Sequence, residues 1–319
     1  MDGTRVSPTP PHTRPGPRLR SAWWLSGLVA ALTVVAATAG LLDDGLYSGP
    51  AALVARIRGN DLATLVAGVP LLVVALVAAV RGSSRGSLVW VGMLAYSIYN
   101  YAYYVYDPAF NDLFLVHVVI VVLSAAALGL ALTDLDVAVR ARVAMRWVGG
   151  LLLLLAATLA GMYGASLVRQ AVSGVPPADV LPLPQAQVHL GMALDLTMVV
   201  PTSVLAGVLL WRRSAWGHAL GVATCVYVGM YQLNYLVARY FVAQAGVQGV
   251  AYAEPLDLLI PALLLAAVLA LVVPRREGRP RAVRLPQVPR RVRPAAHEGR
   301  TARTPGPKVP DRRRTGRPE

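Results

Sequence analysis

The stretch LLVVALVAAVRGSSRGSLVWVGMLAYSIYNYAYYVYDP, residues 71–108, decides the fold class. It contains an apolar run, a short turn with two arginines, and a second run whose last part holds six tyrosines before Asp107 and Pro108. Apolar segments of about 20 residues are long enough to cross the roughly 30 Å hydrocarbon core of a bilayer. The stretch therefore predicts two membrane-spanning helices joined by a tight turn.

The rest of the chain shares this composition. Of its 319 residues, 56% are hydrophobic and 14% are charged, whereas about a quarter of the residues of a soluble domain are charged. Long apolar segments recur, so we predict an all-α fold, a polytopic transmembrane helical bundle with eight spans. The predicted spans are residues 23–41, 62–80, 87–105, 113–132, 147–168, 187–211, 216–238 and 255–273.

The basic residues orient this bundle. With the N-terminus in the cytoplasm, 26 arginines and lysines fall in cytoplasmic segments and 4 fall outside. The positive-inside rule therefore predicts a multi-pass protein of the bacterial inner (plasma) membrane with both termini cytoplasmic. The alternative for the first span is a cleaved signal peptide ending at Ala37-Thr38-Ala39, which would leave seven spans.

The two ends of the chain differ from the middle. Residues 1–22 and the tail from 274 to 319 are rich in proline and arginine, and their formal charges of +3 and +11 account for the whole net charge of +14. We predict that both are disordered and that residues 23–273 form the transmembrane domain. The basic tail is expected either to adhere to anionic lipid headgroups of the bilayer or only to fix the orientation. No nucleic-acid partner is expected, because no aromatic residues interleave with the charges.

Two segments of the chain are similar to each other. PLLVVALVAAVRGSSRG (70–86) and PTSVLAGVLLWRRSAWG (201–217) share seven of seventeen residues, among them Pro70 and Pro201. This similarity favours a parallel 4+4 internal repeat, in which the two halves are related by an axis along the membrane normal. Proline removes a backbone donor, so we expect kinks at both prolines and at Pro261.

Polar residues are predicted to gather in the outer half of the membrane. Asp195 is expected to be the only acidic residue well inside a span, and an intramembrane carboxylate indicates a functional site by default. Asn100 and either Tyr96 or Tyr99 should lie within hydrogen-bonding reach of it. The alternative is that Asp195 is a structural hydrogen-bond anchor. The candidate pocket residues are Asp195, Asn100, Tyr96, Tyr99, His117, His189, Asn234 and Asp257.

The sequence offers little to a metal or a cofactor. Its single cysteine excludes a disulfide framework and a thiolate metal cage, and it contains no hydrolase elbow, P-loop or HExxH motif. We predict no metal and no cofactor. His117 and His189 could ligate a b-type haem, but no other sequence feature supports that.

Two pieces of the chain carry a resemblance. YNYAYYVYDPAFNDLFLVHVVIVVLS (99–124) and LDLTMVVPTSVLAGVLLWRRSAWG (194–217) resemble signature regions of a family of uncharacterised bacterial, in particular actinobacterial, polytopic membrane proteins. The matching residues are Phe110 to Leu115, Asp195, Leu196, Pro201, Trp216 and Gly217. The resemblance covers about fifty residues and implies no activity.

Two classes of function remain open. The first is a small-solute or proton-coupled transporter with an outward-facing polar pocket around Asp195, which the kinked helices and the repeat favour. The second is a membrane-embedded enzyme that acts on a lipid-linked substrate, with Asp195 and a histidine as acid and base, or an accessory protein without chemistry. The sequence leans away from an enzyme, because no catalytic motif is present.

Overall fold

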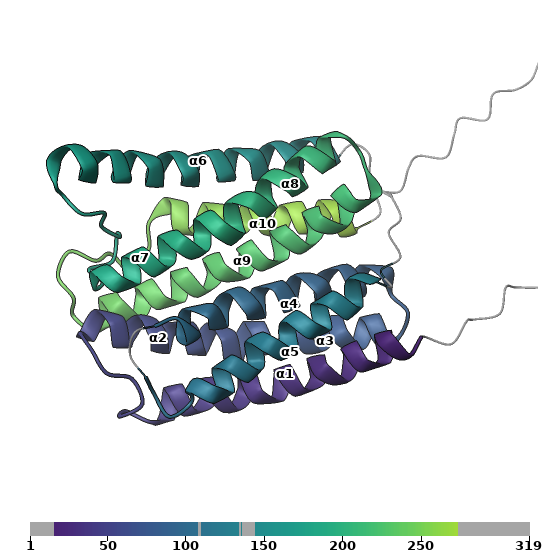
Figure 1. Cartoon of the computed structure of the whole chain (residues 1–319), viewed down its shortest axis with the longest axis horizontal. Coiled ribbons are helices and arrows are strands. Elements are labelled where there is room, and N and C mark those ends of the chain that lie inside the picture. The colour runs from purple at the N-terminus through teal and green to yellow at the C-terminus, as the bar shows by residue number, and fades with distance from the viewer. Residues whose placement is uncertain (1–15, 108–109, 134, 136–143, 274–319) are drawn as a thin grey trace, which may run out of the picture. The chain divides into compact units, whose positions relative to one another are not determined.

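A computed structural model describes residues 16–107, 110–133, 135 and 144–273, and all of these lie in one compact unit. Every regular element among them is a helix (Figure 1). The first half of the unit contains α1 (Pro17–Leu42), α2 (Ala51–Ala63), the π-helical turn η1 (Thr64–Gly68), α3 (Val69–Val80), α4 (Ser84–Val105) and α5 (Phe114–Thr133). The second half contains α6 (Ala144–Ser173), α7 (Gln185–Leu194), the π-helical turn η2 (Asp195–Val199), α8 (Val200–Trp211), α9 (Ala215–Gln244) and α10 (Pro255–Val272).

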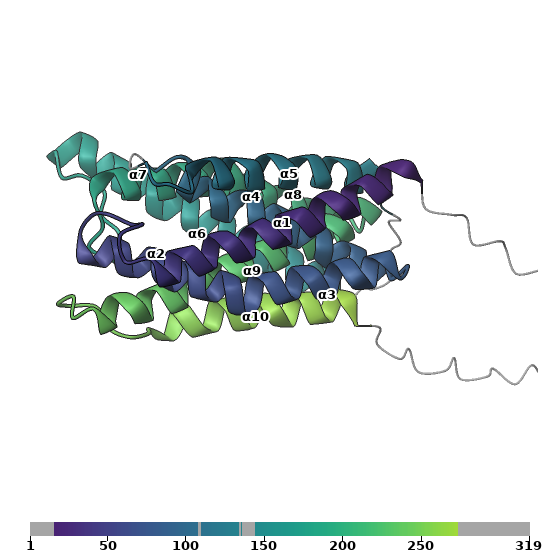
Figure 2. The same ribbon diagram turned by 90° about the horizontal axis from the view of Figure 1, so that it is seen from below.

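Consecutive helices run in opposite directions along the bundle. α2, η1 and α3 form one continuous bent helix, as do α7, η2 and α8, so the described residues make eight helical passes. The start of α1 and the end of α10 lie at the same end of the bundle (Figures 1 and 2). We call the opposite end, where residues 43–50, 174–184 and 245–254 connect helices, the loop end.

Seven of these passes are long and apolar enough to cross a membrane, within the residues that the structure describes. They support an integral, multi-pass membrane protein. The remaining pass is α4, whose tyrosines, serines and asparagine make it more polar than its neighbours. Because α4 packs against α3, α5 and α9, most of its surface is covered by protein rather than by lipid. The eight-span assignment accordingly stays a prediction.

The helix starts that differ most from those expected from the sequence are those of α1 and α2. α1 begins at Pro17, so residues 17–22, which we predicted to be disordered, form its first turns; proline is favoured at the first position of a helix. The second span was predicted to begin at residue 62, but its helix begins at Ala51. Polar side chains interrupt the apolar pattern there, and packing of α2 on α9 and α1 compensates for them. The other predicted terminal residues, 1–15 and 274–319, lie outside the described part.

Both bent helices have the same local structure. A π-helical turn ends two residues before Pro70 in the first and two residues before Pro201 in the second. A proline cannot donate to the preceding turn, and a π-helical turn changes the hydrogen-bond register where that donor is missing. The predicted kinks at these two prolines thus coincide with π-helical turns. Pro261 lies inside α10, which continues through it as one helix.

The turns after the bent helices also match each other. Ser83 accepts a hydrogen bond from the backbone nitrogen of Gly86 at 3.1 Å, and Ser214 accepts one from Gly217 at 2.9 Å, so each serine caps the next helix. A Cβ atom at Gly86 would lie 2.5 Å from the Cβ atom of Ala78, and Gly217 is equally close to the preceding helix. Both turns therefore require glycine at this position.

Two pairs of packed helices recur in both halves, whereas the extensive contacts of α1 with α5 and of α2 with α9 have only small counterparts in the other half. α3 packs on α4 as α8 packs on α9, and α4 packs on α5 as α9 packs on α10. α4 and α9 also pack against each other in the middle of the bundle (Figure 1). These two central helices carry most of the polar side chains described next.

Candidate functional site

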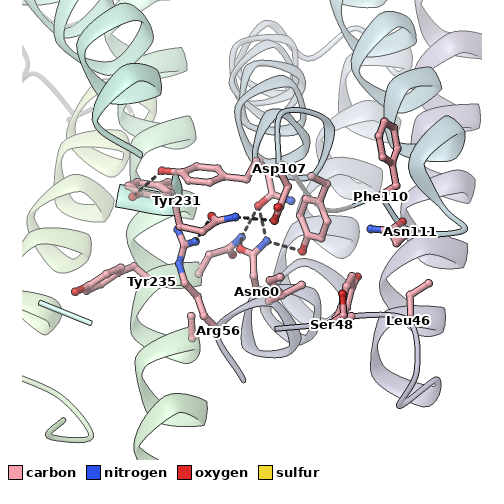
Figure 3. Close-up of a pocket in the computed structure, with 17 residues that line it drawn as sticks. Leu46, Ser48, Arg56, Asn60, Asp107, Phe110, Asn111, Tyr231 and Tyr235 are labelled. Atoms are coloured by element: carbon pink, nitrogen blue, oxygen red, sulfur yellow. Dashed lines mark hydrogen bonds between the residues drawn. The ribbon is translucent and has the colours of Figure 1, made fainter. Parts of the chain in front are cut away.

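A polar pocket lies between α2, α4 and α9 near the loop end (Figure 3). The space within it is about 750 Å³ when the solvent in its open mouth is counted. Loop residues Leu46, Ser48 and Asn111 contribute to its rim. Its walls combine aromatic rings with amides, a pattern suited to a small polar molecule.

One wall of the pocket is a network of five residues that we call the amide cluster: Asn60, Thr64, Tyr96, Asn100 and Asn234. The Nδ2 atom of Asn60 donates to the Oδ1 atom of Asn100 at 2.9 Å. Asn234 lies 2.5 Å from the Oδ1 atom of Asn60 and 2.7 Å from the Tyr96 hydroxyl, which is 2.8 Å from the Thr64 hydroxyl. The cluster joins α2, η1, α4 and α9, since each contributes at least one member.

A buried carboxylate lies beside this cluster at Asp61. Its side chain is 2% exposed and accepts hydrogen bonds from the hydroxyls of Tyr47 at 2.8 Å and Tyr104 at 2.7 Å. The nearby cation, Arg58, forms its ion pair with Asp44 instead. Asp61 has no cationic partner among the described residues.

Asp61 was missed by the sequence analysis, which placed the start of the span one residue after it. A signal was nevertheless present, because Arg56, Asn60 and Thr64 recur at intervals of four residues. That spacing puts them on one face of a helix that extends the span toward the loop end.

A second buried carboxylate is Asp195, the first residue of η2. It is 3% exposed and accepts hydrogen bonds from the hydroxyl of Tyr99 and, at 2.5 Å, from that of Tyr163. The Tyr99 hydroxyl is also 3.2 Å from that of Tyr103, which is 3.3 Å from that of Tyr231. A chain of hydroxyls thus connects Asp195 to the pocket.

Neither carboxylate lines the pocket directly. Tyr104 lies between Asp61 and the pocket, and Tyr103 lines it while contacting Tyr99, the partner of Asp195. The sequence predicted a pocket centred on Asp195. The structure instead shows a pocket lined by tyrosines, amides and Asp107, with Asp61 and Asp195 behind the tyrosines.

The candidates on α4 divide between Asp195 and the amide cluster. Tyr99 contacts Asp195 as predicted, but Asn100 and Tyr96 bond within the amide cluster. Successive residues of a helix are rotated by about 100°, so Tyr99 and Asn100 point toward different neighbours. Asn234, the candidate on α9, is a member of the amide cluster.

The two histidines lie apart from the pocket lining. His117 is buried between the rings of Tyr101 and Tyr104, and the distances between its ring centroid and theirs are 5.5 Å and 4.8 Å. Neither of its ring nitrogens has a hydrogen-bond partner in the described part of the chain. His189 is exposed on α7. No group of three or more histidine, cysteine or acidic side chains that could hold a metal ion occurs among the described residues.

Asp257 belongs to a different cluster. It accepts a hydrogen bond from the backbone nitrogen of Glu254 at 2.9 Å, which caps the start of α10, and its carboxylate is 3.1 Å from Arg239. Asp257 is not among the residues that line the pocket. Helix-capping chemistry explains its position at the start of the span.

Arg239 connects α9 to α10 and to the loop between them. It is buried, it pairs with Glu254 at 2.5 Å as well as with Asp257, and it donates to the carbonyl of Ala251 at 2.9 Å. We expect Arg239→Gln to lower the free energy of unfolding by about 1–3 kcal/mol, because two carboxylates lose their charged partner. Thermal unfolding in detergent measures this. Arg169→Gln, on the exposed surface of α6, is the control and should leave the midpoint unchanged.

No model of a known protein family, no curated protein and no solved structure matches the chain.

Proposed function

We propose that the protein is a proton-coupled transporter of a small polar solute in the bacterial plasma membrane. The observation that carries this proposal is the pair of buried carboxylates, Asp61 and Asp195, each held by two tyrosine hydroxyls behind the lining of a polar pocket. Intramembrane carboxylates of this kind are typical of proton relays in transporters.

Proton binding at Asp195 would change the hydroxyl chain. Both of its carboxylate oxygens accept hydrogen bonds in the structure, which suits the ionised form. A proton on the carboxyl group needs an acceptor, and Tyr99 can become one if its own proton turns toward Tyr103. Tyr103 lines the pocket, so the protonation state of Asp195 would alter the donors that face a solute.

Asp61 is connected to the pocket in the same manner. Tyr104 donates to Asp61 and accepts from the Nδ2 atom of Asn60 at 2.8 Å. If Asp61 is protonated and donates to Tyr104, the Tyr104 hydroxyl proton must turn elsewhere, and the contact with Asn60 changes. Solute binding and proton binding would thereby influence each other, which is the requirement for coupling.

The matching π-helical turns supply a place for movement. Thr64 begins η1 in the amide cluster, and Asp195 begins η2. π-helical turns and proline kinks occur frequently at functional sites and hinges. We further propose that α1 to α5 and α6 to α10 form the predicted 4+4 repeat, supported by the matching π-helical turns and serine caps.

The enzyme alternative has less support. It needs Asp195 and a histidine to act together on a lipid-linked substrate, yet neither His117 nor His189 lines the pocket.

The outward orientation of the pocket follows from the positive-inside argument, because the loop end is opposite the start of α1 and the end of α10.

The proposal is tested by solute-dependent proton flux in proteoliposomes loaded with a pH-sensitive dye. A panel of small polar solutes should include one that drives proton movement through the wild-type protein. Asp61→Asn and Asp195→Asn should reduce that flux at least tenfold, because an amide keeps the size of the side chain but cannot bind and release the proton. Solute-dependent proton flux that survives in the double variant would contradict the proposal.

A further inference from the structure

Arg56 occupies a distinctive place in the pocket. It lies on α2, one turn before Asn60, and its guanidinium carbon is 4.9 Å from the centre of the Tyr103 ring. Its Nη1 atom donates to the Oε1 atom of Gln187 at 3.3 Å. Figure 3 shows this side chain within the pocket, between Asn60 and Tyr235. The contacts hold the guanidinium in a fixed orientation toward the cavity.

Most of the hydrogen-bonding capacity of Arg56 is unused. A guanidinium has five N–H donors, and the structure assigns one hydrogen bond and no ion pair to Arg56 among the described residues. Two other arginines near the loop end differ, since Arg58 pairs with Asp44 and Arg239 pairs with Glu254. Arg169, also near that end, lies on the exposed surface of α6. Arg56 is therefore a cation that faces a cavity and forms no direct ion pair with a carboxylate of the described residues.

Gln187 positions Arg56 without compensating its charge. The amide accepts from Arg56 through its oxygen and donates from its nitrogen to Asp107 at 2.6 Å. Asp107 thus lies one amide group away from the guanidinium. The pocket thus presents one positive charge, on Arg56, and one negative charge, on Asp107, separated by the amide of Gln187. This arrangement suits a ligand with one negative charge better than a phosphate with two negative charges.

Tyr235, on α9, also lines the pocket. An oxyanion at Arg56 could accept two hydrogen bonds from the planar guanidinium fork.

We propose that the pocket binds the carboxylate group of a small monoanionic or zwitterionic solute, with Arg56 as its principal ligand. This inference names the solute class for the proposed function and depends on it for biological meaning. Binding itself requires no transport. The fork of Arg56 would also accept the phosphate of a lipid headgroup, so the test must distinguish the two sources of an oxyanion.

The experiment measures thermal stability of the purified full-length protein in detergent. The probes are acetate, lactate and glycine at matched ionic strength, with inorganic phosphate and phosphatidylglycerol as separate arms. At least one carboxylate should raise the melting temperature in a saturable manner, as expected for a ligand that binds only the folded state. Phosphatidylglycerol and phosphate should produce smaller shifts.

Three variants assign the effect to Arg56. Arg56→Gln should weaken the apparent Kd of the active carboxylate at least tenfold, and Arg56→Lys should weaken it less, because it keeps the charge and loses the fork. Arg58→Gln is the matched control on the same helix and should bind as the wild type does. Melting temperatures without ligand separate loss of binding from loss of folding.

Other outcomes have definite meanings. The inference is overturned if no carboxylate shifts the wild type, if Arg56→Gln binds as tightly as the wild type, or if only phosphatidylglycerol has an effect. Carboxylate binding that depends on Arg56 without any proton flux would contradict the proposed transport and leave the binding site intact. Solute-dependent proton flux that is unchanged in Arg56→Gln would contradict the proposed role of Arg56 and leave the proposed transport intact.

Discussion

Asp61→Leu should lower the free energy of unfolding by about 2–6 kcal/mol. The carboxylate is the hydrogen-bond acceptor for Tyr47 and Tyr104, and a buried donor left without a partner costs about 1–3 kcal/mol. Asp61→Asn should cost much less, because the amide oxygen can accept from one tyrosine and the amide nitrogen can donate to the other. Thermal and denaturant unfolding in one detergent measures both.

The control for this prediction is Asp44→Asn, whose carboxylate pairs with Arg58 at the protein surface. Exposed ion pairs contribute about 0–1 kcal/mol, so the midpoint should hardly move. If Asp61→Leu proved as stable as the wild type, the two tyrosines would have found other acceptors, and the carboxylate would not be an anchor. Asp61→Asn distinguishes the effect on stability from the effect on proton coupling, because this variant should fold normally and lose solute-dependent proton flux.

The class of fold could be predicted because it depends on composition alone. Apolar runs of the right length have no other stable arrangement in lipid than helices packed side by side. The bends at Pro70 and Pro201 were predictable as well, since proline has a local effect on the backbone. The π-helical turns before them were not, because their register depends on how the bent helix packs.

The site was only partly predictable. Asp195 and Tyr99 were expected to meet, and they do, because both lie at a similar depth in facing helices. The rotation of α4 decides that Tyr99 rather than Asn100 faces Asp195, and rotation is set by packing that a single sequence does not reveal. Hydropathy also failed to include Asp61 in the second span. Arg56 and Arg58 lie close to it, and a segment with these charges is too polar to be predicted as membrane-spanning when its side chains are assumed to face lipid.

The polar end of α2 is tolerated because α9 covers it. A polar stripe against lipid would be costly, but Asn60 and Asn234 bond to each other where these helices meet. Their close approach depends on Gly59. The geometry of the pocket wall therefore depends on a glycine that has no side chain to contact a ligand.

Gly59→Ala should lower the free energy of unfolding by about 1–3 kcal/mol and weaken carboxylate binding. A Cβ atom at this position would lie 2.5 Å from the Cα atom of Ala238 and 3.0 Å from its backbone nitrogen. Backbone atoms cannot rotate away as a side chain can, so α2 and α9 must separate, and the contact between Asn60 and Asn234 would lengthen.

The matched control is Gly161→Ala on α6, where a Cβ atom meets nothing within 4 Å. Alanine is the better helix former, so the control should be neutral or more stable by up to about 1 kcal/mol. Equal melting temperatures for the two variants would show that α2 and α9 pack less closely than the structure indicates.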